Sequence, residues 1–204
     1  MGEQQIFNLL IEFFEEDEWD FQWTAGTPIL SMGFQGMNGS WLCYAQAREP
    51  EEQVIFYSDL AINVPPDKRL KIAEFITRVN YGMVIGNFEM DFEDGEVRYK
   101  TSLDIEGAEL TAAMIRQLVY ANLVITDRYL PGIMQVMYSN ISPEAALDNI
   151  ELIQDYEDIF DNNAFLDNDD DNNSEDFNND DDDDFDASPP YFDDMPPMDG
   201  GTPN

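Results

Sequence analysis

The chain has 204 residues, of which 44 are acidic and 9 basic, and its formal net charge is -35. This charge argues against direct binding to nucleic acid or to an anionic membrane surface, because both would repel the protein. Every basic residue lies between Arg48 and Arg128, and none follows. We therefore expect a folded α+β domain at residues 1–154 and a disordered acidic tail at residues 155–204, rich in Asp and Asn.

The cysteine and histidine content limits the kinds of disulfide and active site that the chain can form. Cys43 is the only cysteine and the sequence has no histidine, so an intrachain disulfide is impossible. We expect Cys43 to be a small buried side chain, since no imidazole is present to activate its thiol. The N-terminus lacks the basic start of a signal peptide, and no apolar run approaches the roughly 20 residues that span a bilayer. A cytoplasmic protein is the expectation.

The first third of the chain predicts one helix followed by strands. Apolar side chains recur at helical spacing between Glu3 and Glu16. Alternating or apolar runs then predict strands at residues 19–23, 29–37, 41–47 and 53–58. Asn38-Gly39 lies between the second and third of these runs, and it predicts a tight hairpin turn because both residues readily adopt positive φ.

A second helix, a hairpin and two further helices are predicted next. The helix follows Pro65-Pro66 and the hairpin pairs residues 87–92 with 96–103. Residues 110–139 predict a long helix or two abutting ones, in which Pro131 would remove the hydrogen bond to Asp127 and cause a kink. A short helix follows, capped by Ser142. The expected fold is an antiparallel sheet of five to six strands packed against helices, in the order α-β-β-β(-β)-α-β-β-α-α.

The central part of the chain carries a family resemblance. The segment from Pro65 to Asp104 contains Asn80-Tyr81-Gly82, then Gly86-Asn87-Phe88-Glu89, then Asp94-Gly95-Glu96-Val97-Arg98-Tyr99. These motifs resemble the central signature of the YbjN family, and the resemblance runs from the first helix through Met137. It implies a fold similar to that of type III secretion chaperones, which often dimerise and bind extended segments of client proteins. It supplies no catalytic residues, and Asn87 and Arg98 have both a structural and a ligand-binding interpretation.

Two groups of residues are candidates for protein binding. Residues 112–125 are apolar on nearly every side, so this helix is either sandwiched within the core or supplies a subunit interface. Four of the nine basic residues lie on the second predicted helix, where an acidic segment could dock. The candidates are Met114, Ile115, Leu118, Val119 and Leu123 on the apolar helix, and Lys68, Arg69, Lys71 and Arg78 on the basic one.

We expect neither an enzyme nor a cofactor or metal site. The missing histidine removes the commonest general base and metal ligand. Glu89, Asp91 and Glu93 alternate on one strand face, which is typical of a solvated surface. The leading hypothesis is a non-catalytic protein-binding module, chaperone-like or regulatory, that forms a homodimer and holds a client segment. The alternative is a charge-based regulator whose acidic tail docks a basic protein; that tail could also merely solubilise the chain or cover the four basic residues.

Overall fold

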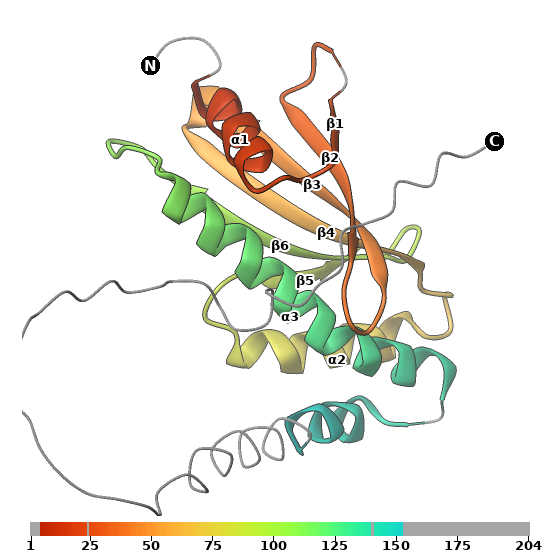
Figure 1. Ribbon diagram of the computed structural model, residues 1–204. Coiled ribbons are helices and arrows are strands. Elements are labelled where there is room, and N and C mark those ends of the chain that lie inside the picture. Colours follow the sequence, from red (N-terminus) through yellow and green to blue (C-terminus); the bar gives the residue numbers. More distant parts are fainter. Residues whose placement is uncertain (1–4, 24, 140, 153–204) are drawn as a thin grey trace, which may run out of the picture. The chain divides into compact units, whose positions relative to one another are not determined.

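The computed structural model describes residues 5–23, 25–139 and 141–152. A six-stranded antiparallel sheet, in the order β1-β2-β3-β4-β6-β5, has its helices packed on one face (Figure 1). The elements are α1 (Gln5–Glu16), β1 (Phe21–Trp23), β2 (Ile29–Gln35), β3 (Ser40–Arg48), a 3-10 turn (Glu49–Glu51), β4 (Gln53–Asn63), α2 (Arg69–Gly82), β5 (Asn87–Met90), β6 (Glu96–Asp104), α3 (Ala112–Tyr138) and a helical segment at residues 143–152. The predicted α+β class and element order are confirmed; the predicted tail and its boundary lie outside the described residues.

Alternating burial along the strands explains why the sheet has one covered face. In β3 and β4 every second side chain is buried beneath the helices, and the side chains between them are partly exposed. α1 packs on β3, α2 on β5, and α3 on β4 and β6. The predicted strand of residues 87–92 is shorter than expected: β5 ends at Met90, so Phe92 lies beyond the strand with 54% of its surface exposed.

The apolar character of α3 has an explanation inside the domain. The helix lies on β4 and β6 and contacts α1 and α2, so it is covered on several sides. Ile115, Leu118, Val119 and Leu123 are only 1%, 4%, 0% and 1% exposed. Of the two alternatives that the sequence left open, the sandwiched helix is the one observed, and these four side chains offer no surface to a partner. α3 also continues through Pro131 as one helix.

The β2–β3 hairpin is confirmed, but the reason for its glycines is different from the expected one. Neither Asn38 nor Gly39 has a positive φ. The loop is longer than a two-residue turn and is closed by a hydrogen bond from the N–H of Gly36 to the carbonyl oxygen of Gly39, at 2.8 Å. A Cβ atom on Gly39 would lie 2.6 Å from Cδ2 of Leu130. A side chain at residue 39 would therefore require the Leu130 side chain to shift, because α3 passes so close to the loop.

Asn122 is a fully buried polar residue near the centre of α3. Nδ2 of Asn122 donates to the carbonyl oxygens of Phe56 and Tyr99 and to Oγ1 of Thr101, at 3.1, 3.3 and 3.1 Å. Its Oδ1 accepts a hydrogen bond of 2.6 Å from the hydroxyl of Ser58. Among the described residues no buried side-chain N or O atom lacks a partner. Asn122 therefore fixes α3 to two neighbouring strands, β4 and β6.

Candidate binding surface

The face of the sheet that carries no helix presents ordered rows of side chains. Strand register places Ser31, Tyr44, Tyr57, Lys100 and Asn87 in one row across β2, β3, β4, β6 and β5. The next row contains Leu42, Asp59, Arg98 and Glu89. Two adjacent tyrosines on the consecutive strands β3 and β4 thus lie beside a line of alternating charges on β4, β6 and β5. We call this the open face.

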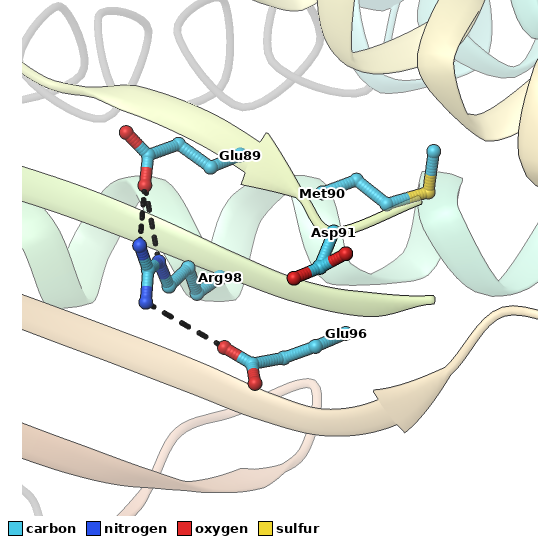
Figure 2. A pocket seen from close by; sticks show the side chains of 5 residues that line it. All are labelled: Glu89, Met90, Asp91, Glu96 and Arg98. Atoms are coloured by element: carbon cyan, nitrogen blue, oxygen red, sulfur yellow. Dashed lines mark hydrogen bonds and ion pairs between the residues drawn. The ribbon is translucent and has the colours of Figure 1, made fainter. Parts of the chain in front are cut away.

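Arg98 is the centre of an ion-pair network on the open face. Its Nε and Nη2 atoms both lie 3.0 Å from Oε2 of Glu89, and Nη1 lies 3.7 Å from Oε1 of Glu96 (Figure 2). The guanidinium carbon lies 4.6 Å from the ring centroid of Tyr57. Lys100 also forms an ion pair with Glu89. Arg98 is therefore held over the Tyr57 ring by its carboxylate partners, which supports its structural interpretation.

The two carboxylates of this network differ in their pKa shifts. Partial burial opposes the ionisation of Glu89, but hydrogen bonds from Lys100 and Arg98 outweigh it, and the pKa of Glu89 is lowered. The pKa of Glu96 is raised, first by partial burial and then by the negative charge of Asp59. Glu89 is consequently a paired, half-buried group rather than part of a solvated acidic face.

Two neighbouring hollows meet at Glu96 and Arg98. The first is lined by Glu89, Met90, Asp91, Glu96 and Arg98 (Figure 2). The second is lined by Ile29, Tyr44, Gln46, Tyr57, Asp59, Glu96 and Arg98. Burial, followed by the charges of Asp59 and Glu96, raises the pKa of Tyr44. The second hollow thus combines aromatic and aliphatic surface with two carboxylates and one guanidinium.

Within the described residues, no group of three or more His, Cys, Asp or Glu side chains could hold a metal ion. Cys43 is buried, as expected, and burial raises its pKa to about 12. Its thiol therefore stays protonated at neutral pH, which removes its nucleophilic form. None of the described helices is both long and apolar enough to cross a membrane.

The basic residues predicted on the second helix do not form one free patch. α2 begins at Arg69, after a turn closed by a hydrogen bond from the N–H of Lys68 to the carbonyl oxygen of Pro65. The Arg69 side chain donates to the carbonyl oxygens of Val64 and Phe92. Arg78 is paired with Glu74 at 2.9 Å, whereas Lys71 is exposed and Lys68 is half-buried. Met114, the remaining candidate on α3, is half-buried.

Sequence reasoning missed the open-face residues Tyr44, Tyr57, Asp59 and Glu96 as candidates. Alternation along residues 41–47 and 53–58 was a usable signal, because it places both tyrosines on the exposed side of their strands. The position of Asp59 beside Arg98 had no such signal, because β4 and β6 pair although α2 and β5 separate them in the chain.

Residues 7–134 match the model of the YbjN family, described as "Putative bacterial sensory transduction regulator". Among solved structures, the chain is similar to "YbjN, a putative transcription regulator from E. coli", with a TM-score of 0.46 and 11% identity over 64% of this chain and 87% of that one. It is also similar to a chain of the HopA1-SchA chaperone–effector complex, with a TM-score of 0.40 and 16% identity over 63% and 95% of the two chains. For the ExsC-ExsE complex the TM-score is 0.44, with 12% identity over 67% and 97%. No curated protein matches. Because the family model covers more than half of its length, the chain belongs to the YbjN family.

Proposed function

We propose that this YbjN-family chain is a non-catalytic protein-binding module, chaperone-like or regulatory, whose binding surface is the open face. The observation that carries the proposal is the pairing of Tyr44 with Tyr57 across β3 and β4, beside a hollow that no described helix covers. Tyrosine and arginine are enriched at the centres of protein interfaces. The family description as a regulator agrees with a protein that acts by binding.

Site-specific photo-crosslinking in cells that naturally make the protein tests this proposal. A photoreactive amino acid is placed at Gln46 or Ile55, which neighbour the tyrosines on the open face. The matched control positions are Thr77 on α2 and Gln117 on α3, which are exposed on the helix side. We expect a discrete crosslinked protein from the open-face positions, mapped by mass spectrometry to one segment of the partner. Equal crosslinking from all four positions, or none from the open face, would contradict the proposal.

A second candidate function uses the acidic C-terminal sequence. Five consecutive aspartates lie at residues 180–184, and no basic residue follows Arg128. Such a segment can dock a basic protein by charge alone. Deletion of residues 155–204 should then abolish capture of the partner, and replacement of these aspartates by asparagine should do the same at physiological salt. Unchanged capture by the neutralised chain would reject this candidate.

The homodimer expected from the sequence stays a prediction, and the main reason for expecting it is now weaker. Four of the five apolar side chains that suggested an interface on α3 are in the core. Light scattering coupled to size-exclusion chromatography measures the mass of the full chain and of a chain shortened at residue 154. A monomer over the whole accessible concentration range would contradict the homodimer and leave the proposed binding surface untouched.

A further inference from the structure

Tyr44 and Tyr57 are neighbours on the open face, but only one of them has a cation over its ring. Arg98 lies over the Tyr57 ring. It comes from β6, the strand next to β4, and from the row that follows the row of Tyr57. Asp59 has the same position relative to Tyr44: it lies on β4, the strand next to β3, and in the following row. The same geometry that provides a guanidinium for Tyr57 therefore provides a carboxylate beside Tyr44.

The hollow beside Tyr44 has the other features of a site for a cation. Asp59 and Glu96 both line it, together with Ile29 and Gln46 from the neighbouring strands. Arg98 also lines the hollow, but its charge is already paired with Glu89 and Glu96. In the part of the chain that the structure describes, no guanidinium or ammonium group lies over the Tyr44 ring. Aromatic rings attract cations through the negative charge of their faces, and the two carboxylates add to that attraction.

We propose that this hollow receives an arginine side chain from an extended segment of a partner protein, with its guanidinium over Tyr44 and against Asp59 and Glu96. The inference rests on the proposed function, for which it names the chemistry of the partner. Arginine fits better than lysine because its planar group stacks on a ring and can still bind two carboxylates with its five N–H donors. The arrangement reproduces the one that Arg98 already forms with Tyr57, Glu89 and Glu96.

Neither the rest of this chain nor a second copy supplies such an arginine readily. The chain has no basic residue after Arg128, so its acidic C-terminal sequence contains no cation for the hollow. Its arginines already have partners: Arg48 with Glu51, Arg69 with two carbonyl oxygens, Arg78 with Glu74, Arg98 with Glu89 and Glu96, Arg116 with Asp17, and Arg128 over the Tyr129 ring. The net charge of -35 also favours encounter with a basic partner over a second copy.

Synthetic peptides test the chemistry without knowledge of the natural partner. The probe is an extended peptide of alternating threonine and valine with one central arginine, titrated into the isotope-labelled full chain and followed by NMR. The comparison peptide carries citrulline, which has nearly the same shape but no charge. We expect the arginine peptide to shift the amide signals of Tyr44, Tyr57 and Asp59 and to bind about tenfold more tightly than the citrulline peptide. Equal affinity of the two peptides, or shifts confined to other elements, would overturn the inference.

Variants distinguish a local site from general attraction to an acidic protein. Asp59→Asn combined with Glu96→Gln should remove the preference for arginine, and Asp59→Asn keeps an acceptor for the N–H of Ala61, 2.9 Å from Oδ1. The control, Glu12→Gln with Asp20→Asn, removes the same charge from exposed residues elsewhere and should keep the preference. Tyr44→Phe should bind like the wild type and Tyr44→Leu should not, with thermal melts used to verify folding. An equal loss in the control pair would overturn the inference.

The remaining outcomes separate this inference from the proposed function. Crosslinking of a partner to the open face together with equal binding of both peptides rejects the arginine site and retains the protein-binding module. Selective arginine binding without any crosslink retains the site and rejects the proposed surface function. Self-association of the peptide-free chain that disappears in Tyr44→Leu would identify a second copy as the occupant, which overturns the inference.

Discussion

Asn38 donates hydrogen bonds to Asp127 from both its side chain and its backbone. Nδ2 of Asn38 donates to the main-chain carbonyl oxygen of Asp127 at 3.1 Å, and Oδ1 of Asp127 accepts from the backbone N–H of Asn38 at 2.8 Å. Pro131 has no N–H, so it leaves this carbonyl oxygen without its partner in α3. The β2–β3 loop thus supplies the hydrogen bond that the proline removes, and this accounts for a helix that continues through Pro131.

This relationship predicts coupling between Asn38 and Pro131. Asn38→Ala should lower the free energy of unfolding by about 1 kcal/mol, because it leaves the Asp127 carbonyl oxygen without its side-chain donor. In a Pro131→Ala background the same substitution should have a smaller effect, because residue 131 then has an N–H that bonds to Asp127. Urea unfolding of both single variants and the double variant measures the coupling. Equal effects of Asn38→Ala in the two backgrounds would contradict the explanation.

Asn80 protects the edge of the sheet at β5. Its Oδ1 accepts from the N–H of Phe88 at 2.8 Å, and its Nδ2 donates to the carbonyl oxygen of Phe88 at 3.0 Å. The side-chain amide therefore replaces a neighbouring strand at this point of an edge that would otherwise be open to pairing. This is the physical role of the asparagine in the Asn80-Tyr81-Gly82 motif.

Asn80→Ala should therefore destabilise the protein by about 1 to 2 kcal/mol and increase its tendency to aggregate. Asn80→Asp is the matched variant: it keeps an acceptor for the Phe88 N–H but has no donor for the carbonyl oxygen, so we expect an intermediate loss. Urea unfolding gives the stability, and static light scattering during mild heating gives the aggregation. Identical behaviour of Asn80→Ala and the wild type would show that the edge needs no cap.

Asn122 should be among the most sensitive positions in the domain. Asn122→Ala leaves the Ser58 hydroxyl and two strand carbonyl oxygens without their α3 partner in a fully buried position, so we expect a loss of about 3 kcal/mol. Gln117→Ala, on the exposed side of the same helix, is the control and should change stability little. Urea unfolding measures both variants. A loss no larger than that of the control would mean that the buried network does not hold α3 to the sheet.

Glu96 should make stability depend on pH in the acidic range. Its pKa is raised in the folded protein by partial burial and by Asp59, so its ionised form opposes folding. This destabilisation is present above the raised pKa and disappears as the pH falls through it. Glu96→Gln should therefore stabilise the protein at neutral pH by only roughly 0.3 kcal/mol, since solvent screens a side chain that is 39% exposed.

Thermal melts of the wild type and Glu96→Gln between neutral and acidic pH measure this effect. The advantage of the variant should shrink as the pH is lowered, because the wild-type carboxylate then becomes protonated. Glu12→Gln, an exposed substitution on α1, is the control for loss of one negative charge. An advantage that grows towards acidic pH would contradict the assigned direction of the pKa shift.

Local patterns in the sequence determined the elements and their order. Burial on one face repeats every second residue in a strand and at helical spacing in a helix, so β3, β4 and α2 could be predicted from their side chains alone. The caps were also local: Thr111 accepts from the N–H of Met114, and Ser142 accepts from the N–H of Ala145. The family motifs likewise lie within one continuous segment, and their assignment to YbjN is confirmed.

Tertiary structure decided which surfaces are available and which polar residues have partners. The apolar pattern of α3 was compatible with a core helix or an interface. Such a pattern indicates how much helix surface is buried, but not whether the same domain or another subunit buries it. Pairing of β4 with β6 places Asp59 beside Arg98, and packing of α3 against the β2–β3 loop joins Asn38 to Asp127. Such contacts depend on how segments that are far apart in the chain pack together, and no local pattern of residues in the sequence indicates this packing. The open face, and with it the candidate site at Tyr44, is therefore a property of the assembled sheet.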